Sequence, residues 1–210
     1  MPRRSTSLSA YDVHPGVAMV QKWVAELPGK TGKSLDQWAA LVGKQGLPTR
    51  AARRTWLKDA HGIGGNQAGW IAEYAEGRPT WDADPESYLT NAEEYVAALF
   101  AGPKAGLKPI FDEFVLLARA LGADVKICPC KTIVPFYRAR VFAEVKPTTR
   151  SRLDFSVALE RDRESVGRLQ RNERKIAQKD RLTHTIAIGS MDDIDAEVAG
   201  WLKVAYDRDA

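Results

Sequence analysis

Residues 136–159 read FYRARVFAEVKPTTRSRLDFSVAL, and this stretch dominates the fold prediction for the second half of the chain. Within 136–146, small and apolar residues alternate with rings and charged residues, so every second side chain points to the same face. Residues 153–159 repeat the alternation, and 147–150 between the two runs has the composition of a turn. The pattern predicts two antiparallel strands, each with one buried face and one face toward solvent.

The flanking segments supply further elements of the same domain. Short apolar runs predict two more strands at 125–130 and 182–188, while helical spacing of apolar residues predicts helices at 93–100 and 107–121. Ser190 is expected to cap a last helix. Together these elements predict an α+β domain with an antiparallel sheet over residues 88–210.

The first part of the chain shows only helical periodicity. A first helix is expected over 17–27, where Pro28 and Gly29 should end it. A second is expected to begin at Ser34, and two more are expected over 50–60 and 66–75. Ser34 and Gln37 have the spacing of a capping box. An all-α domain over residues 1–80 is therefore predicted, and a linker at 76–85, which holds two prolines and a glycine, is expected to join it to the α+β domain.

Composition and charge narrow the classes of function. The chain has 210 residues, of which 44% are hydrophobic, and no apolar run is as long as the roughly 18 residues of a membrane span. Its first residues lack the apolar stretch of a signal peptide, so a cytoplasmic protein with no membrane contact is expected. Residues 1–80 hold 11 Lys and Arg against 6 Asp and Glu, and a sequence pI near 9.1 makes nucleic acid a candidate partner.

A glycine-rich turn in the helical part supports that hypothesis. The run Gly62-Ile63-Gly64, followed by Ala68 and Ile71, resembles the helix-hairpin-helix motif of DNA-repair proteins, in which free N–H groups at a helix start hold a phosphate. The alternative is a plain pair of helices whose glycines serve only the turn. Candidate phosphate contacts around this turn are Arg50, Arg53, Arg54, Lys58, Gly62, Gly64, Gly65 and Asn66.

The strand at 136–146 offers a second cationic surface. Its expected solvent face interleaves Phe136 and Phe142 with cations, which suits contact with bases and phosphates. The alternative is a face covered by another element. Candidate nucleic-acid contacts on and after this strand are Arg138, Arg140, Lys146, Arg150 and Arg152.

The two cysteines support a weaker, different hypothesis. Cys128 and Cys130 lie two residues apart, and His184 is the third candidate ligand of a metal. A fourth ligand is not evident, so neither a metal nor another cofactor is expected. No catalytic residues are assigned. A small-ligand pocket lined by Cys128, Cys130, Lys131 and Phe142 is the alternative site.

Several short motifs carry a family resemblance. TGKSLDQW at 31–38 with HGIG at 61–64 resembles a short bacterial helical domain of unknown function, and CPCKT at 128–132 with KPTT at 146–149 resembles a second such domain. Members like the second are also found fused to restriction-type nucleases, which implies an association with nucleic acid. The leading hypothesis is a non-catalytic module that binds DNA or RNA through phosphates; an enzyme or small-ligand binder and a protein-interaction adaptor are alternatives, and the oligomeric state stays open.

Overall fold

The computed structural model describes residues 9–77 and 84–210, and the chain falls into two compact units. The helical unit runs from Pro15 to Tyr88, and the sheet unit comprises Leu89–Ala210 together with the segment that ends at His14. A helical region followed by a sheet with helices confirms the predicted α+β class. The domain limits at residues 80 and 88 stay a prediction, and residues 78–83 of the expected linker lie outside the described part.

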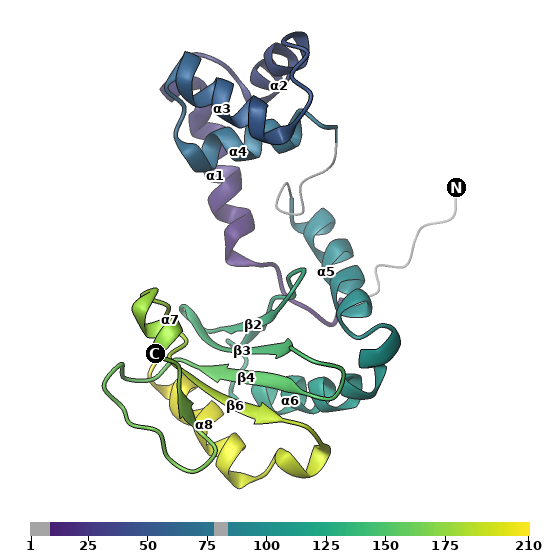
Figure 1. Cartoon of the computed structure of the whole chain (residues 1–210), viewed down its shortest axis with the longest axis vertical. Coiled ribbons are helices and arrows are strands. Elements are labelled where there is room, and N and C mark those ends of the chain that lie inside the picture. Colours follow the sequence, from purple (N-terminus) through teal and green to yellow (C-terminus); the bar gives the residue numbers. More distant parts are fainter. Residues whose placement is uncertain (1–8, 78–83) are drawn as a thin grey trace. The chain divides into compact units, whose positions relative to one another are not determined.

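The described residues of the helical unit form four helices and the first residues of a fifth. Its core consists of apolar side chains spaced three and four residues apart, such as Trp38, Val42 and Leu57, each no more than 2% exposed. The helices are α1 (Pro15–Thr31), α2 (Leu35–Lys44), α3 (Arg50–His61), α4 (Gly65–Tyr74) and α5 (Pro85–Leu99), which continues into the sheet unit (Figure 1).

The end of α1 differs from the prediction. Pro28 does not stop the helix, which continues to Thr31 and ends where Gly32 takes a left-handed backbone with φ of 75°. The last turn is held by Thr31, whose hydroxyl donates to Leu27 O at 2.8 Å and accepts from Trp38 Nε1 at 2.8 Å. The predicted capping box of Ser34 and Gln37 is confirmed at the start of α2.

The sheet unit is built on one antiparallel sheet of six strands, in the order β1-β2-β3-β4-β6-β5 (Figure 1). The strands are β1 (Lys126–Ile127), β2 (Val134–Tyr137), β3 (Val141–Pro147), β4 (Leu153–Val157), β5 (Gln170–Arg171) and β6 (His184–Ile188). The helices are η1 (Gly102–Leu107), α6 (Lys108–Leu121), α7 (Glu173–Ala177), η2 (Met191–Asp193) and α8 (Ala196–Asp207).

The two faces of this sheet differ in polarity. The apolar face packs against α6 and α8, and the rings of Phe114 on α6 and Phe155 on β4 lie 4.8 Å apart between centroids. The polar face carries Glu144 opposite Ser156, which in turn lies opposite Thr185. On this face, Lys175 of α7 contacts Glu144 and Ser156, while Lys146 is exposed.

The predicted single strand at 136–146 is wrong. The chain turns at 138–140, where Arg138 N donates to Arg140 O, and β2 and β3 run antiparallel on either side of this turn. Phe136 and Phe142 are 0% exposed, so they belong to the core and not to a cationic solvent face. The alternation misled because it continues through a turn without glycine or proline. The turn predicted at 147–150 is confirmed between β3 and β4, although Pro147 still belongs to β3.

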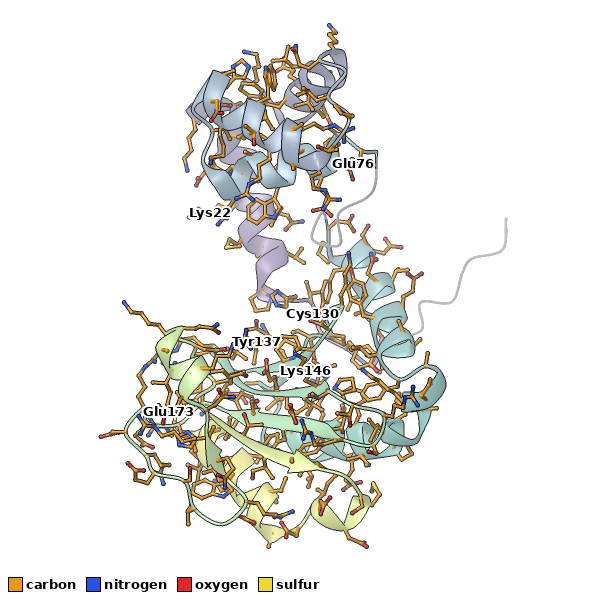
Figure 2. The ribbon with its side chains drawn as sticks, in the orientation of Figure 1. Lys22, Glu76, Cys130, Tyr137, Lys146 and Glu173 are labelled. Carbon is orange, nitrogen blue, oxygen red and sulfur yellow. The ribbon has the colours of Figure 1, made fainter. Side chains whose placement is uncertain are left out.

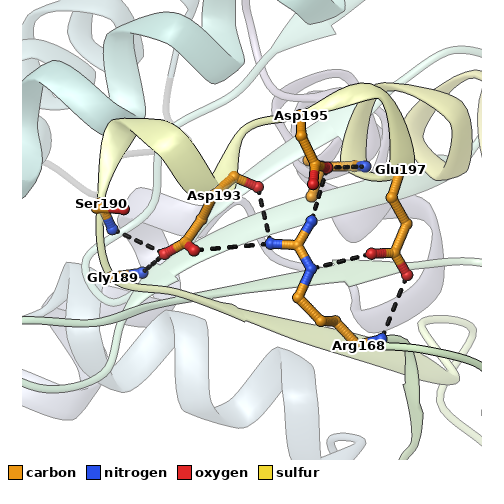
Figure 3. Close-up of polar contacts among 7 residues, drawn as sticks. Arg168, Gly189, Ser190, Asp193, Asp195 and Glu197 are labelled. Atoms are coloured by element: carbon orange, nitrogen blue, oxygen red, sulfur yellow. Dashed lines mark hydrogen bonds and ion pairs between the residues drawn. The ribbon is translucent and has the colours of Figure 1, made fainter.

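The start of the last helix also differs from the prediction. Ser190 caps the short η2 helix, while α8 begins at Ala196 with Asp195 as its N-cap. Arg168 explains this arrangement, since its guanidinium donates to Asp195 at 2.6 Å and to Glu197 at 2.9 Å (Figure 3). These contacts tie the loop before β5 to the first turn of α8, where carboxylates are favourable.

Candidate functional site

A pocket of about 630 Å³ in the sheet unit gathers cationic side chains, and we call it the basic pocket. It lies between the end of α5, the η1 segment, the loop after β1 and the turn between β3 and β4. No carboxylate is among the residues found to line it. The lining residues are Ala98, Leu99, Ala101, Pro103, Lys104, Lys131, Thr132, Lys146, Pro147, Thr148 and Arg150.

Local structure places the cations of the basic pocket. Lys146 is exposed near the end of β3 because its neighbours Val145 and Pro147 occupy the buried face of the same strand (Figure 2). Lys104 Nζ donates to Pro147 O at 2.7 Å, which fixes the end of the strand. Within the described part of the chain, no ion pair is found for Lys131, Lys146 or Arg150. These three cations therefore line the pocket without a carboxylate in ion-pair contact.

Three other residues that were predicted to contact nucleic acid pair with carboxylates of the same chain. Arg138 donates to Asp124 at 2.7 Å, and this hydrogen bond raises the pKa of the guanidinium. The guanidinium also lies 4.2 Å above the Tyr206 ring. Arg140 pairs with Asp209 at 3.3 Å, and Arg152 pairs with Asp154 at 3.1 Å. The structure thus gives these three arginines carboxylate partners, and none of the three is among the residues that line the basic pocket.

A second cavity of about 390 Å³ adjoins the first on the polar face of the sheet, and we call it the polar pocket. Lys146 lines both pockets. At the polar pocket, Lys175 Nζ on α7 donates to Glu144 Oε1 at 2.5 Å and to Ser156 Oγ at 3.3 Å. Its lining residues are Ile133, Glu144, Lys146, Asp154, Ser156, Asn172, Arg174, Lys175, Gln178, Asp180 and Thr185.

The predicted pocket around the cysteines is not assembled as expected. Lys131 lines the basic pocket, whereas Cys128 and Phe142 are 0% exposed and belong to the packed interior. Burial raises the pKa of Cys128, and burial together with the nearby Glu144 raises the pKa of Cys130 to about 11. Both thiols are therefore protonated near neutral pH, which makes them poor nucleophiles.

His184, the third candidate metal ligand, is engaged in other hydrogen bonds. His184 hydrogen-bonds with Thr183 Oγ1 at 2.8 Å and with Arg163 O at 2.9 Å, so both ring nitrogens are engaged. Across residues 9–77 and 84–210, no group of three or more His, Cys, Asp or Glu side chains is arranged to hold a metal ion. In the same ranges, no helix combines the length and apolar character needed to cross a membrane.

The glycine turn of the helical unit lies beside its own cavity, of about 410 Å³. Gly62 ends α3 with φ of 65°, and Gly64 precedes the first residue of α4. Lys58 and Asn66 are exposed nearby. The residues that line this hairpin pocket are Lys30, Thr31, Lys33, Trp38, His61, Gly62, Ile63, Gly64 and Gln67.

The arginines predicted to contact phosphate beside this turn have partners within the helical unit. Arg50 and Arg53 both pair with Glu76, at 2.9 and 3.1 Å, and Arg54 Nε donates to Gly65 O at 3.0 Å. The cations that line the hairpin pocket are instead Lys30 and Lys33, and Lys30 also pairs with Glu26 at 2.7 Å. Each of these arginines thus has a partner within the helical unit, although Arg50 and Arg54 stay exposed, and their contact with phosphate stays a prediction.

The conformation of Gly62 gives a direct stability test. Gly62→Ala is expected to lower the free energy of unfolding of the helical unit by about 1–2 kcal/mol, because φ of 65° is unfavourable for a residue with a Cβ. No atom lies within 4 Å of the added Cβ, so the loss would come from the backbone alone. Chemical denaturation measures it, with Gly43→Ala on α2 as the control that should not lose stability. A Gly62→Ala protein as stable as the parent would contradict this account.

Sequence reasoning missed Lys104, Lys30 and Lys33 as pocket residues, and it missed the polar pocket entirely. Lys104 stands in the segment GPKAGLK at 102–108, whose two glycines and proline signal an exposed connection but not its neighbours. Lys30 and Lys33 flank the end of α1, and their position beside Gly62 depends on how the helices pack. The local sequence therefore does not predict that Lys104 lies at the basic pocket or that Lys30 and Lys33 lie beside Gly62.

Comparison with known proteins gives two family matches. Residues 19–77 match Domain of unknown function (DUF4287), and residues 96–209 match Domain of unknown function (DUF5655). No curated protein and no solved structure matches the chain. The CPCKT and KPTT motifs fall inside the second match, and Lys131, Thr132 and Lys146–Thr148 from them line the basic pocket. Since the match at 96–209 covers more than half of the 210 residues, the chain belongs to the family of Domain of unknown function (DUF5655), with a region matching DUF4287 before it.

Proposed function

We propose that this protein binds nucleic acid through phosphate groups held in the basic pocket. The observation that carries the proposal is the convergence of Lys104, Lys131, Lys146 and Arg150 on a pocket whose lining includes no carboxylate. Phosphate oxygens are the groups that such a set of cations attracts most strongly, and their contacts supply most sequence-independent affinity for nucleic acid. Because Lys131, Lys146 and Arg150 are exposed, they suit a long polyanion that passes over the surface.

The hairpin of the helical unit is the second contact in this proposal. Its resemblance to the helix-hairpin-helix motif, the exposed Lys58 and Asn66, and Lys33 at the hairpin pocket support a phosphate contact there. A cytoplasmic place of action, a bacterial origin and the association of similar domains with restriction-type nucleases belong to the same proposal. No catalytic step is part of this proposal.

Charge reversal in the basic pocket tests the proposal. We expect the Lys131→Glu and Lys146→Glu proteins each to bind a fluorescent DNA oligonucleotide at least about tenfold more weakly, equivalent to about 1.4 kcal/mol, because an attraction to phosphate becomes a repulsion. Fluorescence anisotropy at 50 to 200 mM salt measures this. With about three to four phosphate contacts, log affinity against log salt should slope roughly between −2 and −3 for a single strand, and each reversal should flatten it by about 0.7 or more.

Lys126→Glu is the matched control. Lys126 is exposed on β1 of the same unit and is not among the residues that line the basic pocket, so its reversal changes the net charge equally. This variant should lose less than about threefold in affinity, because only long-range attraction changes. Absence of binding at 50 mM salt would overturn the proposal. An equal loss of affinity in all three variants would show that the DNA is attracted by the overall charge of the protein and not by the basic pocket.

A further inference from the structure

We infer that the polar pocket receives one unpaired base of a single strand, with a preference for cytosine over thymine, while the adjoining phosphate lies in the basic pocket. This inference rests on the proposed function and specifies which form of nucleic acid is bound. It is drawn from the shared position of Lys146, the charges of the two pockets and the hydrogen-bonding groups at the polar pocket.

The two pockets are spaced along one strand. Lys146 lines both of them, and Glu144 lies two residues earlier on β3, at the polar pocket. Two residues of a β-strand span roughly 7 Å, which is the scale of a single nucleotide between its phosphate and its base. One nucleotide can therefore place its phosphate beside Lys146 and its base over the polar face of the sheet.

The charges of the pockets assign the two parts of such a ligand. The basic pocket has only cations among its charged lining residues, whereas the polar pocket combines Glu144, Asp154 and Asp180 with cations. Carboxylates repel a phosphate at short range, so the polar pocket disfavours the charged part of the strand. It suits an uncharged group that exchanges several hydrogen bonds.

Glu144 is held ready to accept such hydrogen bonds. Its side chain is only 11% exposed, and Lys175 Nζ fixes Oε1 at 2.5 Å. A carboxylate accepts about four hydrogen bonds, so the contacts with Lys175 leave acceptor capacity toward the pocket. Ser156 and Thr185, whose hydroxyl oxygens lie 3.0 Å apart, add neutral groups beside it. The ion pair thus orients an acceptor on the floor of the pocket.

Acceptors at this position discriminate between pyrimidines. Cytosine presents an N4 amino group, which Glu or Asp accepts, whereas thymine presents the O4 carbonyl at the same place. A carboxylate facing O4 would lack a proton between the two oxygens, so this acceptor favours cytosine over thymine. In a duplex these groups are paired and stacked, so a base must be unpaired to enter.

Binding of oligonucleotides tests the inference. We expect a fluorescent ten-residue oligo-dC to bind about fivefold or more tightly than oligo-dT of the same length, and a closed duplex hairpin to bind more weakly than oligo-dC. Glu144→Gln, which retains an acceptor for Lys175, should reduce the oligo-dC preference to less than about twofold. Asp154→Asn serves as a second variant because its carboxylate is on the adjoining strand and is 26% exposed.

The control is Glu173→Gln, since Glu173 is exposed on α7 and is not among the residues that line the polar pocket (Figure 2). This variant should retain the preference. Equal affinity for oligo-dC and oligo-dT, or tighter binding of the duplex, in the parent protein would overturn the inference while leaving phosphate binding intact. No binding of any oligonucleotide would instead defeat the proposed function. A preference unchanged in both the Glu144 and Asp154 variants would remove the polar pocket from base recognition.

Discussion

The Phe142→Ala protein is expected to lose about 3–5 kcal/mol of the free energy of unfolding of the sheet unit. Phe142 is 0% exposed, and its ring lies 5.6 Å from the Tyr206 ring in an edge-on arrangement and 6.5 Å from the Phe136 ring. Removing the ring would leave a cavity between β2, β3 and α8, and packed neighbours fill such a cavity only in part. This loss is comparable to the total stability of many domains.

Native-state hydrogen exchange is the suitable measurement, because it reports opening of the sheet unit separately from the helical unit. The amides of β3 should lose protection by about the stated free energy. Phe142→Leu, which keeps most of the buried volume, should cost less than about 1.5 kcal/mol and serves as the control. A loss below about 1 kcal/mol in the alanine variant would favour the alternative prediction from the sequence, in which the ring lines a ligand pocket.

The Asp209→Ala protein is expected to lose about 3 kcal/mol of stability, because it would break a buried carboxylate network. The Asp209 side chain is 0% exposed and accepts from Arg140 N at 2.6 Å and from Arg181 Nη2 at 2.5 Å. Its removal leaves the Arg140 N–H without its acceptor and detaches the chain terminus from the turn between β2 and β3. Since the Arg140 side chain is 65% exposed, water can solvate that charge, which limits the cost.

The control is Asp207→Ala, two residues earlier. Asp207 pairs with Lys203 at 2.6 Å on the surface of α8, and both side chains are more than half exposed. An exposed pair of this kind contributes less than about 0.5 kcal/mol. Urea denaturation followed by far-ultraviolet circular dichroism should therefore separate the two variants clearly. Equal stability of both variants would show that the Asp209 network contributes nothing measurable.

These two predictions concern residues whose environment could not be read from neighbouring sequence. Arg140 and Asp209 are 69 positions apart, and Phe142 meets Tyr206 across a similar separation. Periodicity reports only the direction of a side chain relative to its own strand, and it does not identify what covers that face. For this reason the cationic face predicted at 136–146 became a hairpin with two buried rings and two paired arginines.

The sequence predicted those features of the fold that depend on interactions between residues a few positions apart. Ser34 and Gln37 specify the start of α2 because their side chains satisfy N–H groups within one turn. The alternation along β3 and β4 specifies the sheet, since Val145 and Phe155 must share the buried face that Lys146 and Asp154 avoid. The α+β class follows from such short-range preferences, which add up independently of how distant segments meet.

The candidate site depended on the tertiary structure. Lys146 was recognisable as the end of a strand and Arg150 as part of the turn that follows, with Lys131 in another segment, but only folding brings them beside Lys104. The same folding joins Arg138 to Asp124 and Arg140 to Asp209, so carboxylates of the same chain offset those two charges. The sequence gives the charge of each residue. Neutralisation of that charge requires an opposite charge within a few ångströms, and the packing of segments that are distant in the sequence sets this distance.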